Sequence, residues 1–402
     1  MAETRGVAEQ NAGTRILVIG ESLVDVVEGD ASASGSNAAS TSTSTSTSTA
    51  SSPSTSTEHV GGSPLNIAYG LARLGRPVEL LTAIGPDARG TAITEHLDAA
   101  GVAVLPASNR TEPTSTATAR LRADGSADYV FDLRWSLPIG SIELAEELEP
   151  AIVHTGSIAA FLEPGGAAIV ELLSALAGSE HPPLVTFDPN MRPSIITDHA
   201  SAFERFTAIA ALTDVLKLSD EDAEWLFPNA SVDEALDRIL ALGPALVAVT
   251  RGGDGAILAT ARDRVAVPGV RVEVADTIGA GDSFMSALIF SLAALLDASA
   301  STPGATSADD PSRGGAPAEA STSTWDASGG GAPADASTST STWDASRGGA
   351  SGGGAFVDAL RSGTAFDAAG LDRLGAFSVR CAAVTVSRAG ANPPTLAEVA
   401  PA

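Results

Sequence analysis

Short apolar runs alternate along the chain with segments whose apolar residues recur at helical spacing. The apolar runs predict buried strands over residues 15–20, 78–84, 152–155, 184–188, 215–218 and 245–250. Helical spacing predicts helices over 66–74 and 91–100, each followed by or ending at a glycine, and an apolar helix over 285–296. This alternation predicts an α/β fold with a mainly parallel sheet and helices on both faces. In such folds ligands bind beyond the carboxyl ends of the strands.

A smaller group of strands interrupts this alternation. Residues 116–122 and 128–133 flank the turn sequence ADGS at 123–126, which predicts a β-hairpin. Residues 24–28 also have the composition of a strand. We therefore expect a small accessory sheet beside the main one.

Two segments have a composition that does not fit a packed core. Residues 30–57 are almost wholly Ser, Thr and Ala, and residues 298–355 are rich in Gly, Ala, Ser, Thr and Pro, with an imperfect repeat that contains Trp325 and Trp343. Such sequences bury too little apolar surface to offset chain entropy, so both are predicted to be disordered insertions. With a flexible terminus over 1–14, this leaves 15–29, 58–297 and 356–398 as one predicted domain.

Charge and cysteine content narrow the possible partners and the cellular compartment. The chain has 402 residues, with 23 Lys and Arg against 49 Asp and Glu, and a formal net charge of −26. This acidity disfavours nucleic acid and anionic membranes as partners. The single cysteine, Cys381, excludes an intramolecular disulfide and is expected to be a buried, inert thiol. We find no secretory signal and no run of roughly 18 apolar residues, so we expect a cytoplasmic protein.

The sequence DTIGAGDSF at 276–284 is the strongest candidate for a functional site. A glycine-flanked turn at the head of a helix points several backbone N–H groups to one place, where the helix dipole also favours an anion. Asp282 lies beside that turn, where a carboxylate can accept the proton of an attacking hydroxyl. Taken alone, an aspartate that only caps the helix explains this position equally well.

A second glycine-rich segment, GGSPLN at 61–66, opens the first predicted helix. Gly61 and Gly62 allow the backbone to approach a ligand closely, and Asn66 offers both a donor and an acceptor. A simple glycine turn into a helix is the alternative, and it leaves Asn66 unexplained. The chain has no G-x-x-x-x-G-K-[ST] motif, which argues against a P-loop enzyme.

Together, the two segments resemble the two signatures of the ribokinase family, the phosphofructokinase B type of carbohydrate kinase. The resemblance covers about residues 15–29, 58–297 and 356–395. It implies a ribokinase-like three-layer αβα sandwich, with a small β lid from about 22–29, 58–62 and 114–134. It also implies an ATP-dependent sugar kinase that transfers the γ-phosphoryl group to a primary hydroxyl of a small carbohydrate.

The resemblance assigns roles to residues that match the family's motifs. Asp282 matches the base that deprotonates the sugar hydroxyl, and Gly279, Ala280 and Gly281 match the anion hole. The matching sugar contacts are Asp25, Gly61, Gly62 and Asn66.

For the nucleotide, the resemblance points to segments nearer the carboxyl terminus. The turn with Thr250, Gly252 and Gly255 resembles the family's nucleotide-holding turn, and Asn392 matches the position that closes over adenine. Lys217 is expected to balance phosphate charge. Ser219 and Asp222 stand where the family usually has Asn-x-x-Glu, which reaches Mg²⁺ through water, and Asp222 is one methylene shorter than that Glu.

A monovalent cation is a further expectation from the family. Members are often activated by K⁺ bound to backbone carbonyls, which here correspond to Asp276, Ile278 and the 388–390 turn with Gly390. The position that often supplies a side-chain oxygen is Pro394, with Thr395 next to it. Potassium activation therefore stays open.

Substrate identity is less constrained by the sequence. The segment FDPNMRP at 187–193 is similar to one shared by fructokinases and 2-keto-3-deoxygluconate kinases. Arg192 is expected to reach a sugar hydroxyl, a carboxylate or a phosphate, or alternatively to pair with a surface acid such as Asp188; Arg134 is another candidate. Fructose is favoured, with 2-keto-3-deoxygluconate, ribose and nucleosides as alternatives. A non-catalytic sugar or nucleotide sensor, and a homodimer formed through the lid, are further alternatives.

Overall fold

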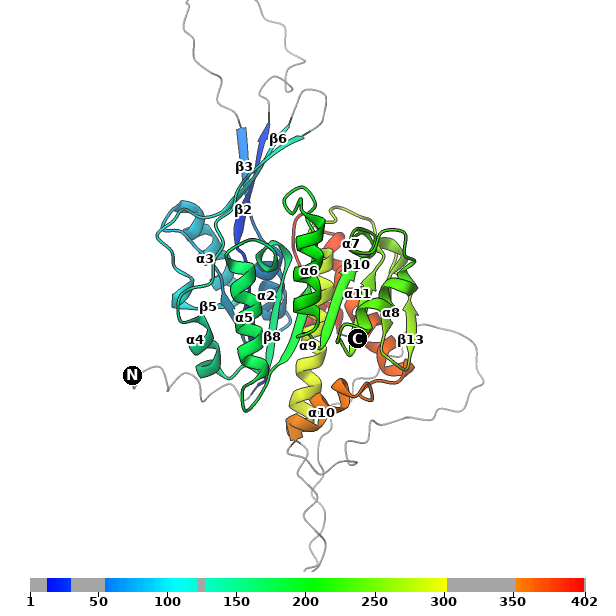
Figure 1. Ribbon diagram of the computed structural model, residues 1–402. Helices are drawn as coiled ribbons and strands as arrows, with labels where there is room; N and C mark the ends of the chain where they lie inside the picture. Colours follow the sequence, from blue (N-terminus) through cyan, green and yellow to red (C-terminus); the bar gives the residue numbers. More distant parts are fainter. Residues whose placement is uncertain (1–12, 30–54, 122–126, 302–351, 401–402) are drawn as a thin grey trace, which may run out of the picture.

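A mainly parallel sheet forms the centre of the main body of the protein (Figure 1). The computed structural model describes residues 13–29, 55–121, 127–301 and 352–400. Within these residues nine strands pair in the order β13-β12-β11-β10-β9-β8-β1-β4-β5, and the β12–β13 edge is antiparallel. The strands are Ile16–Ile19 (β1), Val78–Leu81 (β4), Ala103–Val104 (β5), Ile152–Gly156 (β8), Leu184–Asp188 (β9), Val215–Ser219 (β10), Leu246–Thr250 (β11), Ala256–Ala259 (β12) and Arg264–Val267 (β13).

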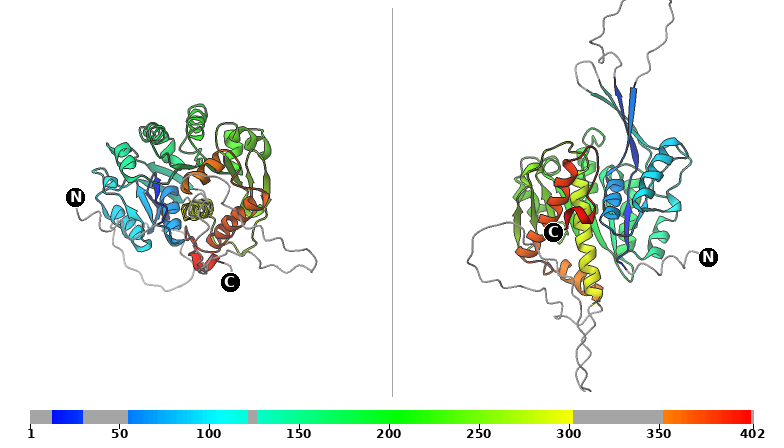
Figure 2. Two further views of the ribbon diagram at one scale, coloured as in Figure 1. Left: turned by 90° about the horizontal axis from the view of Figure 1, so that it is seen from below. Right: turned by 180° about the vertical axis from the view of Figure 1, so that it is seen from behind.

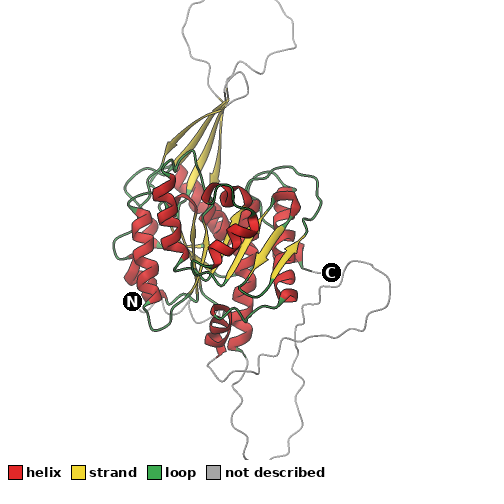
Figure 3. Ribbon diagram, turned by 45° about the vertical axis from the view of Figure 1, so that its right-hand side comes forward, coloured by secondary structure: helices red, strands yellow, loops and turns green. Residues whose placement is uncertain are grey.

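Helices cover both faces of this sheet, as Figures 2 and 3 show. One layer holds Ser63–Arg73 (α2), Ala88–Ala100 (α3), Ala280–Ala300 (α9), Gly352–Arg361 (α10) and Ala368–Val386 (α11). The other holds Ser141–Leu148 (α4), Gly165–Ala177 (α5), His199–Ala210 (α6), Asp220–Leu226 (α7) and Val232–Leu240 (α8). Successive residues of a strand point to opposite faces, so Ile16 and Val18 pack into the first core and Leu17 and Ile19 into the second. The predicted αβα sandwich is confirmed.

A separate four-stranded sheet rises from one side of the main body and forms the lid (Figure 1). Its strands pair in the order β3-β2-β6-β7 and comprise Leu23–Gly29 (β2), Thr55–Gly61 (β3), Thr116–Leu121 (β6) and Ala127–Asp132 (β7). The antiparallel β2–β3 hairpin ends with Gly29 opposite Thr55. The predicted accessory sheet is therefore present. The end of β2 and the start of β3 are paired at the tip of the lid.

Helix α9 lies along the centre of its layer, between α2 and α11 (Figure 2). It has 21 residues, and its most apolar 18-residue window has a mean hydropathy of 1.6, so by length and composition alone it is long and apolar enough to cross a membrane. This corrects the sequence-based expectation of no such run. Its most apolar window is 67% buried in the protein, which is typical of the core helix of a globular domain. Near its end Asp297 accepts hydrogen bonds from Thr14, which anchors the entry into β1.

Several predicted boundaries differ from the structure for local reasons. The helix expected at residue 91 begins at Ala88, because the Asp87 side chain caps it by accepting from the Gly90 N–H. The strand expected to reach residue 84 ends at Leu81, since the chain leaves the sheet and Ile84 bridges to Asn109. The helix expected to begin at residue 66 starts at Ser63.

The edges of the two predicted insertions also differ. Residues 55–57 belong to β3, residues 298–300 complete α9, and residues 352–355 begin α10. The remaining residues of both segments, with Trp325 and Trp343, lie outside the described residues, as do residues 1–12. Where the chain returns in α10, Arg361 donates to the Asp214 carboxylate at 2.7 Å from Nε. This ion pair fixes α10 to the end of the sheet at which β10 begins.

Candidate functional site

The first turn of α9 carries the Gly-Ala-Gly-Asp sequence. Gly279 is the N-cap, with a left-handed φ of 76°, and Asp282 lies in the first helical turn with 9% of its surface exposed. The interpretation of Asp282 as an N-cap is therefore wrong. Its carboxylate instead accepts hydrogen bonds from Ser63 Oγ at 2.6 Å and from Asn66 Nδ2 at 2.8 Å. The carboxylate is fixed in place beside the backbone N–H groups of the turn, among which that of Ala280 donates to the Thr277 carbonyl at 3.3 Å.

Helix α2 positions these two donors. Its N-cap is Gly62, with a φ of 112°, and an added Cβ there would lie 2.6 Å from the Glu21 carbonyl oxygen. Only glycine allows the chain to pass this close to the base of the lid. The helix then packs against α9, which brings Ser63 and Asn66 onto the carboxylate. Sequence reasoning missed Ser63, although it directly follows the glycine pair on the first helical turn.

A buried lysine lies beneath the same turn. Lys217 on β10 has only 4% of its side chain exposed and donates to Asp188 Oδ2 at 2.9 Å. A Cβ added at Gly281 would lie 2.8 Å from Lys217 Nζ, so the ammonium is in contact with the turn of Gly279, Ala280 and Gly281, the predicted anion turn. Burial lowers the pKa of Lys217, but Asp188, Asp222 and Asp282 outweigh it and raise the pKa overall. Lys217 is therefore a fixed positive charge in the site.

The base of the lid brings further charged groups together. Asp25 on β2 faces His59 on β3, and a Cβ added at Gly61 would lie 2.5 Å from Asp25 Oδ2. Asp25 is exposed by surface area. Desolvation by the protein around the base of the lid nevertheless raises the pKa of its carboxyl, although the charges of His59 and Arg192 act to lower it. Arg192 donates to the Asn190 and Met191 carbonyls, and Asp188 is fully buried beside Lys217. The alternative that Arg192 pairs with Asp188 is therefore wrong.

Glu21 is a buried acid between the main sheet and the lid. Its Oε2 accepts the Ala159 N–H at 3.0 Å, and burial raises its pKa from 4.5 to about 7, although hydrogen bonds and Arg192 oppose the shift. The nearby Ser157 is a non-glycine residue with a positive φ of 55°. Backbone conformations of this kind concentrate at functional sites. Sequence reasoning did not identify Glu21, because only the fold shows its burial.

Residues expected to hold nucleotide lie at the carboxyl ends of β10 and β11. Thr250 ends β11, and Gly252 and Gly255 belong to the turn that leads into β12. Ser219 caps α7 in a reciprocal capping box with Asp222. Asp222 accepts from the Ser219 N–H through Oδ2 and from the Met191 N–H, 2.7 Å away, through Oδ1. Both carboxylate oxygens thus already bind backbone, which limits direct contact with a metal.

The loop before α9 is tied to the turn near the carboxyl terminus. Asp276 accepts from the Ile278 N–H and, at 2.9 Å, from the Gly390 N–H. Ala391 lies against Gly279, and Asn392 is exposed next to it. The loop with Asp276 and Ile278 and the turn with Gly390, which are expected to supply cation-binding carbonyls, are therefore adjacent. Four large apolar side chains of this loop are exposed, namely Val270, Val272, Val274 and Ile278.

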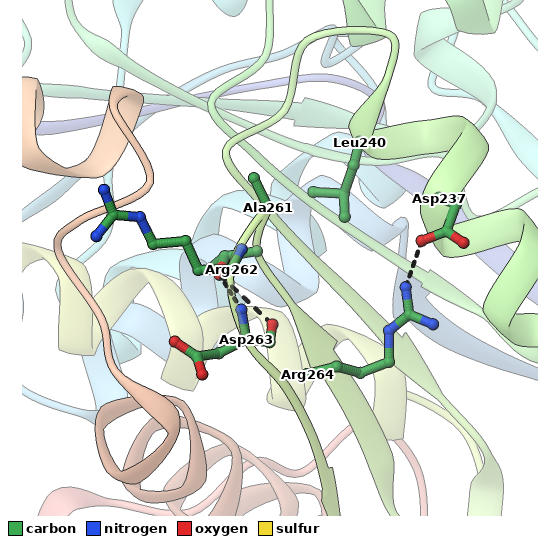
Figure 4. Close-up of a pocket in the computed structure, with 7 residues that line it drawn as sticks. Asp237, Leu240, Ala261, Arg262, Asp263 and Arg264 are labelled. Atoms are coloured by element: carbon green, nitrogen blue, oxygen red, sulfur yellow. Dashed lines mark hydrogen bonds and ion pairs between the residues drawn. The ribbon is translucent and has the colours of Figure 1, made fainter.

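Two other features lie apart from this site. Arg134 pairs with Asp132 at the end of the lid, where both side chains are about half exposed. Figure 4 shows a surface recess of about 450 Å³, lined by residues 260–264 and by α8. It lies at the end of the sheet where β11 begins, away from Thr250. Its lining includes Arg262 and Asp263, and Arg264 there is neutralised by Asp237. The recess is thus distinct from the charged groups around Asp282.

The family of this chain follows from its similarity to known proteins. The model of the family described as "pfkB family carbohydrate kinase" matches residues 14–308. The chain belongs to the pfkB family of carbohydrate kinases. As a member it is a phosphotransferase that acts on a sugar hydroxyl, and the sequence-based assignment to this family is confirmed.

Individual pfkB relatives include several fructokinases. The chain is 31% identical to the fructokinase of Rhizobium leguminosarum bv. trifolii over 282 residues, which cover 69% of this chain and 79% of the relative. It is 32% identical to the fructokinase of Klebsiella pneumoniae over 247 residues, 58% of this chain and 77% of the relative.

Solved structures support the same fold. The fructokinase of Xylella fastidiosa with bound ATP has a TM-score of 0.63 at 20% identity, and the match covers 96% of each chain. The fructokinase of Vibrio cholerae O395, bound to fructose, ADP and a calcium ion, has a TM-score of 0.55 at 24% identity, with 70% of this chain and 85% of the other covered.

Proposed function

We propose that this pfkB carbohydrate kinase transfers the γ-phosphoryl group of ATP to a primary hydroxyl of fructose. The observation that carries the proposal is the fixed carboxylate of Asp282 beside the Gly279–Gly281 turn and the Lys217 ammonium. A base, an anion hole and a buried cation are the groups that phosphoryl transfer to a hydroxyl requires. Fructose is favoured over other sugars because curated relatives more than 30% identical are fructokinases.

Asp282 is the general base in this mechanism. Ser63 and Asn66 hold one carboxylate oxygen each, so the group keeps its orientation while its remaining lone pairs stay available for a substrate proton. The sugar hydroxyl loses its proton to Asp282 as its oxygen attacks the terminal phosphorus in line with the leaving ADP oxygen. A non-catalytic sensor has no use for a base held in this way, which favours an enzyme.

The anion turn and Lys217 stabilise the phosphoryl group in transfer. The N–H groups of Ala280 and Gly281 lie at the amino end of α9, where the dipole of a 21-residue helix is positive. Lys217 adds a full charge on the inner side of the turn. Donors that are already in place gain strength as negative charge develops, without reorganisation.

The sugar lies between the lid and the main sheet, where it is held by Asp25, Gly61, Gly62 and Arg192. Asp25 accepts hydrogen bonds from sugar hydroxyls, and the exposed Arg192 guanidinium donates to the far end of the sugar. Closure of the lid over these groups excludes water, which would otherwise accept the phosphoryl group.

The nucleotide and its metal fit the remaining residues. Thr250, Gly252 and Gly255 hold the phosphates, and the exposed apolar side chains of Val272 and Val274 with Asn392 supply a surface for adenine. Among the described residues no group of three acids, histidines or cysteines is poised to bind a metal. Mg²⁺ does not require such a group of protein ligands, because it is commonly bound through nucleotide phosphates and water. Asp222 would hold such a water, and the ion would neutralise phosphate charge.

A K⁺ ion is proposed at the loop joined by Asp276 and Gly390. The Asp276–Gly390 hydrogen bond brings the carbonyl-bearing segments together beside the anion turn. Replacement of K⁺ by Li⁺ in the assay is expected to lower kcat. Unchanged kcat in buffers free of K⁺ and Na⁺ would remove this part of the proposal.

Assembly and compartment complete the proposal. A homodimer is proposed through the lid, because this four-stranded sheet projects from the main body; analytical ultracentrifugation tests it. Cys381 is a fully buried thiol whose pKa burial raises to about 12, which is consistent with the reducing cytoplasm.

The test is ADP release with fructose, 2-keto-3-deoxygluconate, ribose and adenosine as acceptors, in Mg²⁺ and K⁺. We expect the largest kcat/KM with fructose, and NMR of the product identifies the phosphorylated oxygen. Higher kcat/KM with another acceptor would replace fructose. Binding of a sugar without turnover of any would favour the sensor.

A further inference from the structure

The Lys217 ammonium depends on a single dedicated partner. Asp188 ends β9 and Lys217 lies on the neighbouring strand β10, with 0% and 4% of their side chains exposed. Within the described residues, the only hydrogen bond found for Lys217 Nζ goes to Asp188 Oδ2, at 2.9 Å. An ammonium has three N–H donors, so two remain for a ligand at the anion turn.

The other carboxylates near Lys217 are engaged elsewhere. Asp222 binds the Ser219 and Met191 N–H groups, and Asp282 binds Ser63 and Asn66. Both contribute to the charge around Lys217, but Asp188 is the only one that bonds to it. Asp188 Oδ1 is buried and has no hydrogen-bond partner among the described residues.

Burial makes this partner necessary. A lysine removed from water loses its proton near neutral pH unless an opposite charge compensates. It also needs a fixed direction, because its four-carbon side chain has many rotamers. Asp188 supplies both the charge and the direction, since its fully buried carboxylate lies 2.9 Å from the Lys217 ammonium.

We propose that Asp188 is a positioning residue for phosphoryl transfer, which holds the Lys217 ammonium charged and in contact with the Gly279–Gly281 turn. This rests on the proposed function, since Lys217 then contacts the phosphoryl group and Asp188 acts through Lys217.

The test compares Asp188→Asn with Lys217→Met and with a matched control, Asp214→Asn. Asp214 also pairs with a cation, Arg361, but at the opposite end of the strands. We expect Asp188→Asn to lower kcat about 100-fold, as loss of one oxyanion donor does, with KM for the sugar within about threefold. Asp214→Asn is expected to lower the melting temperature and leave kcat within about threefold.

The pH profile separates positioning from a general structural role. Groups facing Lys217 are Asp188 on β9, Asp222 on α7, Asp282 on α9 and His154 on β8. Asparagine removes the one hydrogen-bonded charge, so desolvation prevails and Lys217 deprotonates at lower pH. We expect the alkaline limb of kcat to move to lower pH in Asp188→Asn, to be absent in Lys217→Met, and to be unchanged in Asp214→Asn.

Two outcomes overturn the inference in a folded Asp188→Asn protein. One is a loss of kcat with an unmoved alkaline limb. The other is recovery of kcat at raised Mg²⁺, which would assign the carboxylate to the metal. ADP affinity measured by calorimetry over the same pH range gives a readout independent of turnover. A wild-type protein that binds ADP with this pH dependence but phosphorylates no sugar would refute the proposed function and, with it, the role of Asp188 in phosphoryl transfer. Asp188 would then support nucleotide binding alone.

Discussion

Asn66 Nδ2 lies 2.8 Å from Asp282 Oδ2, although the two residues are 216 positions apart in the chain. The contact joins the first turn of α2 to the first turn of α9, so the two glycine-rich segments meet at one carboxylate. Asn66, which the sequence suggested as a sugar contact, also orients the proposed base. This relationship makes both helices part of one site and leads to the first two predictions.

Asp282→Asn is expected to lower kcat about 10³- to 10⁴-fold, because the amide has almost the same shape but does not accept the proton. Sugar affinity, measured by calorimetry, is expected to change less than about threefold. Asp237→Asn is the control, since this acid lies in the distant recess. Turnover within about tenfold of wild type would remove Asp282 as the base.

Asn66→Asp places a second carboxylate 2.8 Å from Asp282. Two acids this close share protons, so the pair has at least one raised pKa. We expect the acidic limb of the kcat/KM profile to move to higher pH, with at least about a tenfold loss at pH 7. Asn109→Asp, on an exposed loop, is the control. An unchanged acidic limb would mean that Asn66 does not orient the base in solution.

Gly279→Ala tests the anion turn. Its φ of 76° disfavours any side chain, and the added Cβ would lie 2.8 Å from the Ala391 Cβ. We expect a melting temperature lowered by several degrees and a kcat lowered about 100-fold. Gly354→Ala is the matched control, because nothing lies within 4 Å of its added Cβ and alanine favours the helix. Equal kcat values in the two variants would contradict the role of the turn.

Glu21→Gln tests the buried acid at the base of the lid. The pKa of Glu21 is about 7 in the folded protein against an ordinary 4.5, so the folded state binds the proton more tightly than the unfolded chain. Its contribution to stability is therefore lost as pH rises from about 4.5 through 7. Relative to wild type, Glu21→Gln should gain up to about 3 kcal/mol in free energy of unfolding between pH 4.5 and pH 8.

An acid with the opposite shift controls for this effect. Hydrogen bonds from the Thr395 backbone, and then from Arg388, lower the pKa of Glu398 to about 2. Glu398→Gln is therefore expected to lose stability at pH 7, with the loss fading as pH falls. Chemical denaturation at several pH values measures both variants. Parallel pH dependence of the two would show that these shifts do not govern stability.

The sequence was sufficient for the fold class, the lid and the elements that meet at the site. Alternating apolar runs marked β1 and β8 to β11, and the glycine-rich segments marked the starts of α2 and α9. These features are local in the chain, where periodicity and turn composition are strong signals.

Side-chain partners were less predictable, since they depend on packing between distant segments. Nothing near Asp188 in sequence indicates that it pairs with Lys217 rather than with Arg192. The burial of Glu21 likewise depends on a segment distant in sequence, which contains Ala159. The length of α9 was underestimated because its first turn is rich in glycine and its last turn merges with a low-complexity composition.

The pairing of Gly29 with Thr55 at the tip of the lid has a practical consequence. Because these two positions are neighbours across the β2–β3 hairpin, a polypeptide whose own termini lie close together can be grafted between them without forcing the strands apart. A fluorescent reporter domain inserted there would move with the lid, and its emission would report sugar-dependent movement of the lid in real time.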